Sequence, residues 1–365
     1  MTSDKQITIY SRVVQWLDSR YGILELLDYL RHKNVPLHRA SVWYYFGGVS
    51  LFLFVVQVLT GILLLLYYIP GSDTAYESVK MIVSNVQFGW LVRSVHSWSA
   101  NLMILALFIH MFSVFFTRAY RKPRELTWVT GILMLFLAMG FGFSGYLLPW
   151  NELAFFATKV GTDILGALPV IGDMLLRVVR GGDDVTPATL SRFFGLHVAV
   201  LPGIFTTILC LHLLAIQWQG MHEPEHWKEL PEEQKLRMPF FPNFFLRDLL
   251  LWILVVNLLA LLAVFFPWEL GAKADPFVPT PQGIRPEWYF LSMFQTLKIA
   301  PAHVLGIEGE LLVILGMGVA GMLWLLWPFV ERFPRTKNGN VLHTMVGCVL
   351  LAYIVAMSLW GYFAS

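Results

Sequence analysis

The sequence predicts an all-α, polytopic membrane protein with seven transmembrane helices. Of its 365 residues, 57% are hydrophobic and only 14% are charged, a balance typical of membrane proteins. The hydrophobic residues gather in seven apolar runs, each long enough to cross about 30 Å of hydrocarbon as a helix. We expect the seven spans at residues 42–68, 88–117, 126–148, 192–217, 248–267, 309–330 and 341–363.

The segments outside the spans predict the domain organisation. Residues 1–41 mix apolar and charged side chains, which is typical of an amphipathic segment lying on the inner membrane surface. The charged stretch 219–246 predicts a cytoplasmic linker between a four-helix domain, 42–218, and a three-helix domain, 247–365. The formal net charge of +2 provides no basic surface, so we expect no nucleic-acid partner.

The distribution of basic residues predicts the orientation. If the N-terminus is inside, the inner segments carry 17 of the 26 Lys and Arg residues and the outer loops carry eight. Basic residues gather on the cytoplasmic side of membrane proteins, so the N-terminus is expected in the cytoplasm and the C-terminus outside. The mixed, charged N-terminus predicts no cleavable signal.

Two of the spans each carry a pair of histidines. His96 and His110 are 14 residues apart, which is about 40° around a helix and about 21 Å along it. His197 and His212 are 15 apart, which is about 60° and about 22.5 Å, and Pro202-Gly203 between them predicts a bend that absorbs the extra residue. Imidazole is the commonest metal and haem ligand, so two matched pairs predict two metal centres, one above the other.

A second repeat supports this interpretation. Gly47 and Gly61 are 14 residues apart, and so are Gly131 and Gly145, in two further spans. Glycine lets a flat macrocycle lie against a helix backbone, whereas the alternative is ordinary small-residue packing between membrane helices. The repeated interval favours two stacked haems. The only cysteines, Cys210 and Cys348, lie in apolar runs and form no Cys-x-x-Cys-His attachment motif, so these haems should be non-covalent b haems.

These residues belong to longer motifs: FGWLVRSVH, KPRELTWVTG, GYLLPW and PEWYF (Pro286 to Phe290). Together they resemble the cytochrome b/b6 family, the core of quinol–cytochrome c and quinol–plastocyanin reductases. The resemblance covers about residues 35–365. Residues 1–218 resemble the b6-type subunit, and residues 247–365 resemble its separate three-helix partner, subunit IV.

The resemblance implies a mechanism and a setting. Quinol is oxidised near the outer face. One electron then leaves to a Rieske iron–sulfur protein and a c-type cytochrome subunit, and the other crosses through two b haems to a quinone site near the inner face. It also implies a homodimeric complex surrounded by lipid in a bacterial cytoplasmic (inner) membrane.

The resemblance also implies residue roles. The outer haem is assigned to His96 with His197, and the inner haem to His110 with His212. Glu287, beside Pro286, would accept a quinol proton at a pocket lined by Tyr146. The remaining assignments are Arg93 and Arg124 near haem propionates, Arg247 and Asp248 at the inner quinone site, and the four glycines Gly47, Gly61, Gly131 and Gly145 against the haems.

Two of these assignments have alternatives, and one family feature is missing. Arg124, with Lys122, also fits simple inside-positive topology, and Asp248 also fits a carboxylate that caps a helix N-terminus. Tyr45 stands where b6-type proteins have the cysteine that tethers a third haem, so no tethered haem is expected.

Two other functions share part of the pattern. A dihaem b membrane anchor of a dehydrogenase or hydrogenase would use the same histidines, but it would explain neither PEWYF nor the long outer loop 268–308. A transporter with structural histidines would bind no haem.

Overall fold

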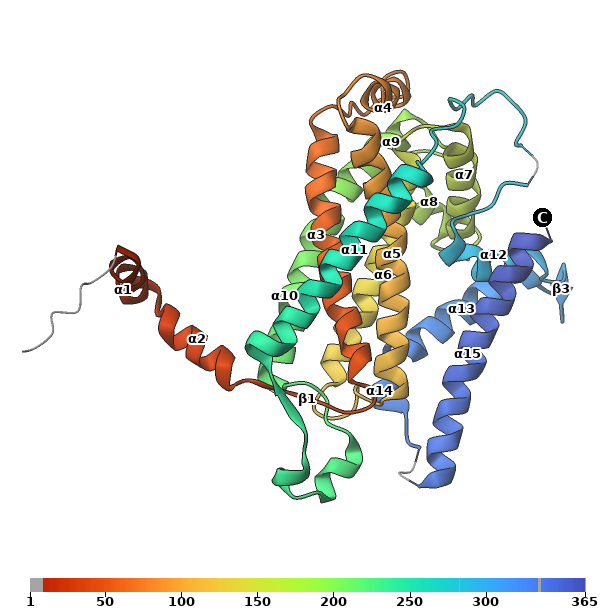
Figure 1. The fold of residues 1–365 in the computed structure, drawn as a ribbon. Helices are drawn as coiled ribbons and strands as arrows, with labels where there is room; N and C mark the ends of the chain where they lie inside the picture. The colour runs from red at the N-terminus through yellow and green to blue at the C-terminus, as the bar shows by residue number, and fades with distance from the viewer. Residues whose placement is uncertain (1–8, 282, 334–335, 365) are drawn as a thin grey trace, which may run out of the picture. The chain divides into compact units, whose positions relative to one another are not determined.

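The computed structural model is mostly helical and describes residues 9–281, 283–333 and 336–364 (Figure 1). Its contacts divide the chain into two units. The smaller unit comprises the chain up to residue 45 together with residues 221–256, and the larger unit comprises residues 46–220 and 257–365.

The predicted spans appear as long apolar helices. Six are long and apolar enough to cross a membrane among the described residues. The run predicted at 309–330 forms a helix of 17 residues followed by a single turn, so it is the shortest of the seven. The helices are α3 (Tyr45–Leu65), α5 (Gly89–Phe116), α6 (Glu125–Leu147), α10 (Leu201–Gln219), α11 (Phe245–Phe265), α13 (Gly309–Leu325) with α14 (Trp327–Val330), and α15 (Lys337–Phe363).

Four of these helices form a bundle in the larger unit (Figure 1). Helix α6 packs against both α5 and α10. Helix α3 is joined to α5 by Gln57, whose amide donates hydrogen bonds to Ser99 and to the backbone carbonyl of His96. Buried polar groups need such partners in hydrocarbon, so this contact fixes the two helices against each other.

The interval between His197 and His212 is one residue longer than that between His96 and His110. The structure accommodates this extra residue at His197, before the predicted bend at Pro202-Gly203. Helix α9 (Pro187–Gly195) continues into a π-helical turn, η2 (Leu196–Val200), in which the Leu201 N–H donates to the carbonyl of Leu196. A π turn contains one residue more than an α turn, and His197 lies inside it. Pro202 follows this turn within the same continuous helix, so the register shifts at the π turn around His197, before the chain reaches Pro202-Gly203.

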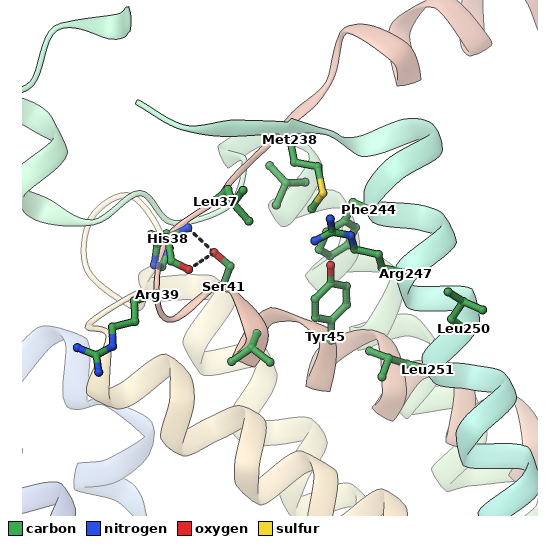
Figure 2. Close-up of a pocket in the computed structure, with 12 residues that line it drawn as sticks. Leu37, His38, Arg39, Ser41, Tyr45, Met238, Phe244, Arg247, Leu250 and Leu251 are labelled. Atoms are coloured by element: carbon green, nitrogen blue, oxygen red, sulfur yellow. Dashed lines mark hydrogen bonds between the residues drawn. The ribbon is translucent and has the colours of Figure 1, made fainter. Parts of the chain in front are cut away.

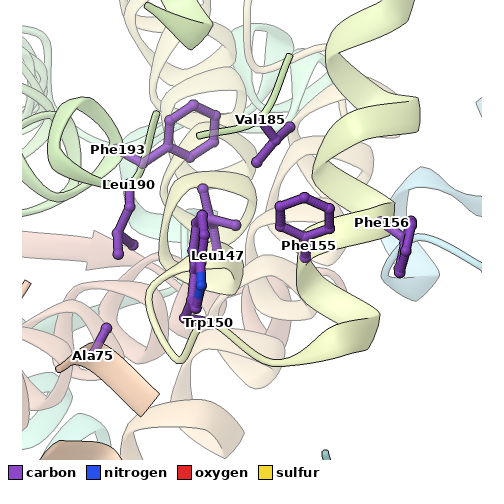
Figure 3. Packing of buried hydrophobic residues seen from close by; sticks show 8 residues of the cluster. All are labelled: Ala75, Leu147, Trp150, Phe155, Phe156, Val185, Leu190 and Phe193. Atoms are coloured by element: carbon purple, nitrogen blue, oxygen red, sulfur yellow. The ribbon is translucent and has the colours of Figure 1, made fainter. Parts of the chain in front are cut away.

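The stretch 149–191, predicted as a long loop, contains regular helices. It contains α7 (Glu152–Gly166) and α8 (Gly172–Arg180), which pack against each other. They lie over an apolar cluster in which Leu147 and Trp150 meet side chains from α7 and α9 (Figure 3). The cluster contains Ala75 of α4 (Ala75–Ser84), Leu147, Trp150, Phe155, Phe156, Val185, Leu190 and Phe193.

The stretch 268–308 also contains regular structure. The PEWYF motif enters a short 3-10 helix, η6 (Trp288–Phe290), and continues as α12 (Leu291–Lys298), which packs against α15. A small hairpin, β3 (His303–Val304) and β4 (Ile307–Glu308), then leads into α13.

A buried polar network ties α14 and α15 to the connection between α5 and α6. The Glu331 carboxylate is 3% exposed and receives hydrogen bonds of 3.0 and 2.9 Å from the Arg121 guanidinium. The Tyr120 hydroxyl accepts a hydrogen bond from Trp327 at 3.0 Å, and His343 stacks on Phe115.

The smaller unit is held together by residues far apart in the chain. Strand β1 (Asn34–Pro36) pairs antiparallel with β2 (Arg237–Pro239), so Val35 lies opposite Met238. Both side chains are buried with Phe244. The unit also contains α1 (Ile9–Tyr21), α2 (Ile23–His32), η1 (Ser41–Tyr44), η3 (Glu225–Glu229), η4 (Glu232–Gln234), η5 (Phe240–Phe244) and the first half of α11.

Candidate haem and quinone sites

Two histidines face each other across the bundle at one level. His96 projects from α5 and His197 from the π turn before α10, and their ring centroids are 6.4 Å apart with an interplanar angle of 70°. Bonds between a metal and an imidazole nitrogen are about 2 Å long, so this separation suits one ion held by both rings. The structure therefore brings together the two residues that the sequence analysis assigned to one haem.

The second pair lies two heptads further along the same helices. His110 is in α5 and His212 is in α10, and His212 is buried. His110 is close enough to act electrostatically on His212. The bundle thus brings all four histidines together as two pairs, stacked along its length.

Each glycine of the 14-residue repeats faces one of these rings. A Cβ atom placed on Gly47 would stand 3.2 Å from His110 Cε1, and one on Gly61 would stand 3.4 Å from His96 Cε1. The corresponding distances are 3.5 Å from Gly131 to His212 and 2.6 Å from Gly145 to His197. Helices α3 and α6 therefore come closest to the histidines where they lack a side chain.

A set of hydroxyl groups that was not predicted from the sequence lies at the same positions. Thr60, Thr130 and Ser144 each precede one of the glycines and lie within hydrogen-bond distance of a histidine Nδ1. Their place directly before the repeated glycines was the signal in the sequence that could have identified them.

The two arginines assigned to haem propionates have backbone partners. Arg93 is 8% exposed, and its guanidinium donates to the carbonyls of Trp268 at 2.5 Å and Glu269 at 3.2 Å. No carboxylate within the described ranges forms an ion pair with Arg93, so its positive charge is available to a bound anion. Arg124 donates to the carbonyls of Gln219 and Gly220 at the end of α10, which stabilises the C-terminus of that helix.

A third group of residues gathers around the PEWYF motif. Burial raises the pKa of the Glu287 carboxyl. Tyr146 of α6 and the buried Tyr289 both lie within electrostatic range of this carboxyl. The structure therefore brings Tyr146 and Glu287 together, although 140 positions separate them in the chain.

The neighbours of Glu287 hold the motif in place. The Trp288 indole N–H donates to the Asn101 side-chain oxygen of α5 at 2.8 Å. The ring of Phe290 packs edge-on against Phe143 of α6. Asn101 had no predicted role in the sequence, and only the folded chain shows that its side chain holds the PEWYF segment.

A separate cavity of about 490 Å³ lies within the smaller unit (Figure 2). Its volume is within the range of small-molecule sites. The Arg247 guanidinium lies beside the Tyr45 hydroxyl, and both face the cavity (Figure 2). The other lining residues are mostly apolar, with His38, Arg39 and Ser41 as the polar exceptions.

Asp248 has a different environment from Arg247. It is not among the residues that line the cavity, and its Oδ1 atom is buried without a hydrogen-bond partner in the described part of the chain. The helix begins at Phe245, three residues before Asp248, so the alternative role as its N-cap does not fit.

An apolar bundle with two stacked histidine pairs and no covalent attachment motif defines the class of membrane dihaem b cytochromes. Family models agree with this class. Residues 31–220 match the model "Cytochrome b/b6/petB", and residues 273–365 match "Cytochrome b(C-terminal)/b6/petD". The chain belongs to the cytochrome b/b6 family.

One relative and one solved structure match nearly the whole chain, and a second relative matches more than half of it. A "cytochrome bc complex cytochrome b subunit" of Chlorobaculum thiosulfatiphilum is 48% identical over 94% of this chain and 79% of that protein. Cytochrome b6 of Synechococcus sp. (strain JA-3-3Ab) is 42% identical over 59% of this chain and 99% of its own length. A solved structure titled "Hyperthermophilic respiratory Complex III" matches 96% of this chain and 98% of that chain, with a TM-score of 0.78 and 26% identity.

The comparisons confirm the predicted class. The protein is a cytochrome b subunit of a bc complex, a quinol oxidoreductase, and members of its family bind two b haems and interact with quinone. The alternative of a dehydrogenase or hydrogenase anchor is not favoured.

Proposed function

We propose that His96 with His197 holds the outer b haem and that His110 with His212 holds the inner one. The observation that carries this assignment is the facing arrangement of His96 and His197 at 6.4 Å, with a glycine of a neighbouring helix against each ring. Bound iron with two imidazole ligands supplies reversible one-electron transfer without an open position for oxygen. The chain holds and orients each ring.

Arg93 supports the outer position. Its buried guanidinium has two carbonyl partners and no carboxylate partner among the described residues, so a propionate would balance its charge. The corresponding role of Arg124 stays a prediction, because its guanidinium donates to the carbonyls of Gln219 and Gly220 at the C-terminus of α10.

Quinol oxidation is assigned to the site around Glu287 and Tyr146. A carboxylate whose pKa is raised toward the working pH is suited to accept a proton from a bound quinol hydroxyl. Pro286 begins the motif, Trp288 anchors it to Asn101, and the aromatic neighbours restrict water. Glu287 would then release the proton toward the outer face.

Quinone reduction is assigned to the cavity beside Arg247. Its apolar walls suit a quinone ring, and the Arg247 guanidinium and Tyr45 hydroxyl can donate hydrogen bonds to a quinone carbonyl. Asp248, one residue further on, would supply protons by a movement of its side chain toward the cavity.

The membrane orientation, the partner subunits and the dimeric state are also part of the proposed function. The excess of basic residues in the inner segments supports a cytoplasmic N-terminus and an outer C-terminus in a bacterial inner membrane. Rieske and c-type cytochrome subunits are the proposed electron-accepting partners, and the complex is proposed to be a homodimer.

Loss of single histidines tests the haem assignment. His110→Ala should remove one haem and leave the absorption spectrum of the other largely intact, and His96→Ala should remove the other one. His303→Ala, an exposed histidine in the β3–β4 hairpin, is the matched control and should retain both haems. A protein that keeps two b haems after His110→Ala would contradict the assignment, and a haem-stained band on a denaturing gel would contradict non-covalent attachment.

A further inference from the structure

Three of the four histidines have a hydroxyl partner at Nδ1. The distances are 2.8 Å from Thr60 to His96, 2.9 Å from Thr130 to His212 and 3.1 Å from Ser144 to His197. Each hydroxyl belongs to the residue directly before a glycine of the 14-residue repeats, so one short motif places both the glycine and the hydroxyl at a ring.

The hydroxyls can only accept from these rings. Each donates its single proton to a backbone carbonyl four residues earlier in its own helix, at 2.6 Å for Thr60, 2.9 Å for Thr130 and 2.8 Å for Ser144. A hydroxyl has one proton, so its oxygen must receive the Nδ1–H of the imidazole. Nδ1 therefore carries the proton, and Nε2 keeps a free lone pair for a metal.

The fourth histidine lacks this partner. The residue before Gly47 is Phe46, which has no hydroxyl, and His110 Nδ1 is buried with no hydrogen-bond partner in the described ranges. On the proposed ligand assignment, both ligands of the outer haem donate to a hydroxyl, but only one ligand of the inner haem does so.

We propose that Thr60, Thr130 and Ser144 are positioning residues that tune the haem potentials, and that their unequal number helps to set the direction of electron transfer. An Nδ1–H that donates a hydrogen bond makes the imidazole a stronger ligand, which stabilises oxidised iron and lowers the potential. Two such bonds at the outer haem and one at the inner haem make transfer from outer to inner more favourable. This inference rests on the proposed ligand pairs.

The test is a redox titration of both haems in the assembled complex. Thr60→Val should raise the potential of the outer haem only, and Thr130→Val should raise that of the inner haem only. We expect the reduced-to-oxidised ratio at a fixed potential to change by about three- to tenfold, the range of one hydrogen bond. That change corresponds to about 30–60 mV for a one-electron couple.

Adding the missing hydroxyl gives an independent test. Phe46→Thr should lower the potential of the inner haem relative to Phe46→Val. Valine has the same shape as threonine but lacks its hydroxyl. Thr130→Ser should keep the potential of the inner haem at its wild-type value, because serine retains the hydroxyl that accepts from His212 Nδ1. Thr207→Val is the matched control, since Thr207 is exposed on α10 and its hydroxyl makes the same bond to a carbonyl four residues back, that of Gly203, at 2.8 Å.

The outcomes separate this inference from the ligand assignment. Each haem is identified by its loss in His96→Ala or His110→Ala. Unchanged potentials in Thr60→Val and Thr130→Val, with both haems retained, would overturn the tuning role and leave the ligand pairs intact. If both variants shifted the same haem, the ligand pairs themselves would be wrong. If Thr→Val variants lost haem, equal potentials in Phe46→Thr and Phe46→Val would still overturn the inference.

Discussion

The hydroxyl of Tyr289 occupies the place that a side chain on Gly142 would need. A Cβ atom at Gly142 would stand 2.1 Å from the Tyr289 hydroxyl oxygen, far closer than two such atoms can approach. Tyr289 is 7% exposed and lies two residues after Glu287, so the missing side chain on α6 allows the PEWYF motif to pack where it does.

The first prediction follows from this contact. Gly142→Ala should displace Tyr289 and with it Glu287, so quinol oxidation should slow while both haems remain bound. Gly140→Ala is the control on the same helix, because its Cβ would meet Leu201 only at 4.0 Å. The measurement is the rate of quinol-driven haem reduction together with haem content. Equal rates in the two variants would show that Tyr289 does not position the site.

The second prediction concerns the glycines that face histidines. Gly145→Ala should disturb the outer haem most, because its Cβ would stand 2.6 Å from His197 Cε1. Gly131→Ala should be tolerated better, since the distance to His212 is 3.5 Å, an ordinary contact. Haem content and the spectrum of each haem measure the effect, and Gly195→Ala, with open space around it, should change neither. A reversed order would mean that bound haem rearranges these contacts.

The third prediction tests the proton acceptor. Glu287→Gln keeps the size of the side chain but removes the base, which should lower quinol oxidation by about 10²–10⁴-fold. Burial raises the pKa of Glu287, so the wild-type rate should climb with pH as this carboxyl deprotonates, and that limb should be absent from the variant. Haem content should not change. Glu269→Gln, an exposed residue of the same connecting stretch 268–308, serves as the control. An unaltered rate and pH profile in Glu287→Gln would mean that the proton leaves by another route.

The fourth prediction concerns stability. Burial alone would raise the pKa of Glu331, but the hydrogen bonds and charge of Arg121 outweigh it and lower the pKa. The ion pair therefore stabilises the fold above the pKa of the unfolded carboxyl, about 4.3. This stabilisation is lost as the pH falls through the lower pKa of the folded state.

Glu331→Gln should accordingly reduce the unfolding free energy at neutral pH by about 3–5 kcal/mol, because it leaves Arg121 without its charge partner. Thermal unfolding in detergent, followed by circular dichroism, measures the loss. Glu77→Gln breaks the exposed pair with Lys273 and should cost less than about 1 kcal/mol. Equal losses in the two variants would show that burial of the Glu331 pair does not matter.

The sequence by itself determined the membrane class, the apolar runs that become helices, and the spacing of two histidines within each of two runs. These follow from hydrophobic run length and helical periodicity, which are local properties, so the 14-residue interval between His96 and His110 already placed them on one face. The predicted role of Glu287 rested instead on the resemblance of PEWYF to a motif of the cytochrome b/b6 family.

Only the tertiary structure decided which groups meet between helices. The hydroxyl of Thr60 reaches His96, Arg93 meets the carbonyls that follow α11, and Arg247 lines a cavity closed by a β1 strand roughly two hundred residues earlier. Such contacts depend on the distance and rotation between packed helices, and helical periodicity specifies neither. The π turn at His197 is the clearest case. The sequence showed that the interval from His197 to His212 is one residue longer than that from His96 to His110, but the hydrogen bonds of the folded backbone decided that the additional residue lies in a π turn at His197.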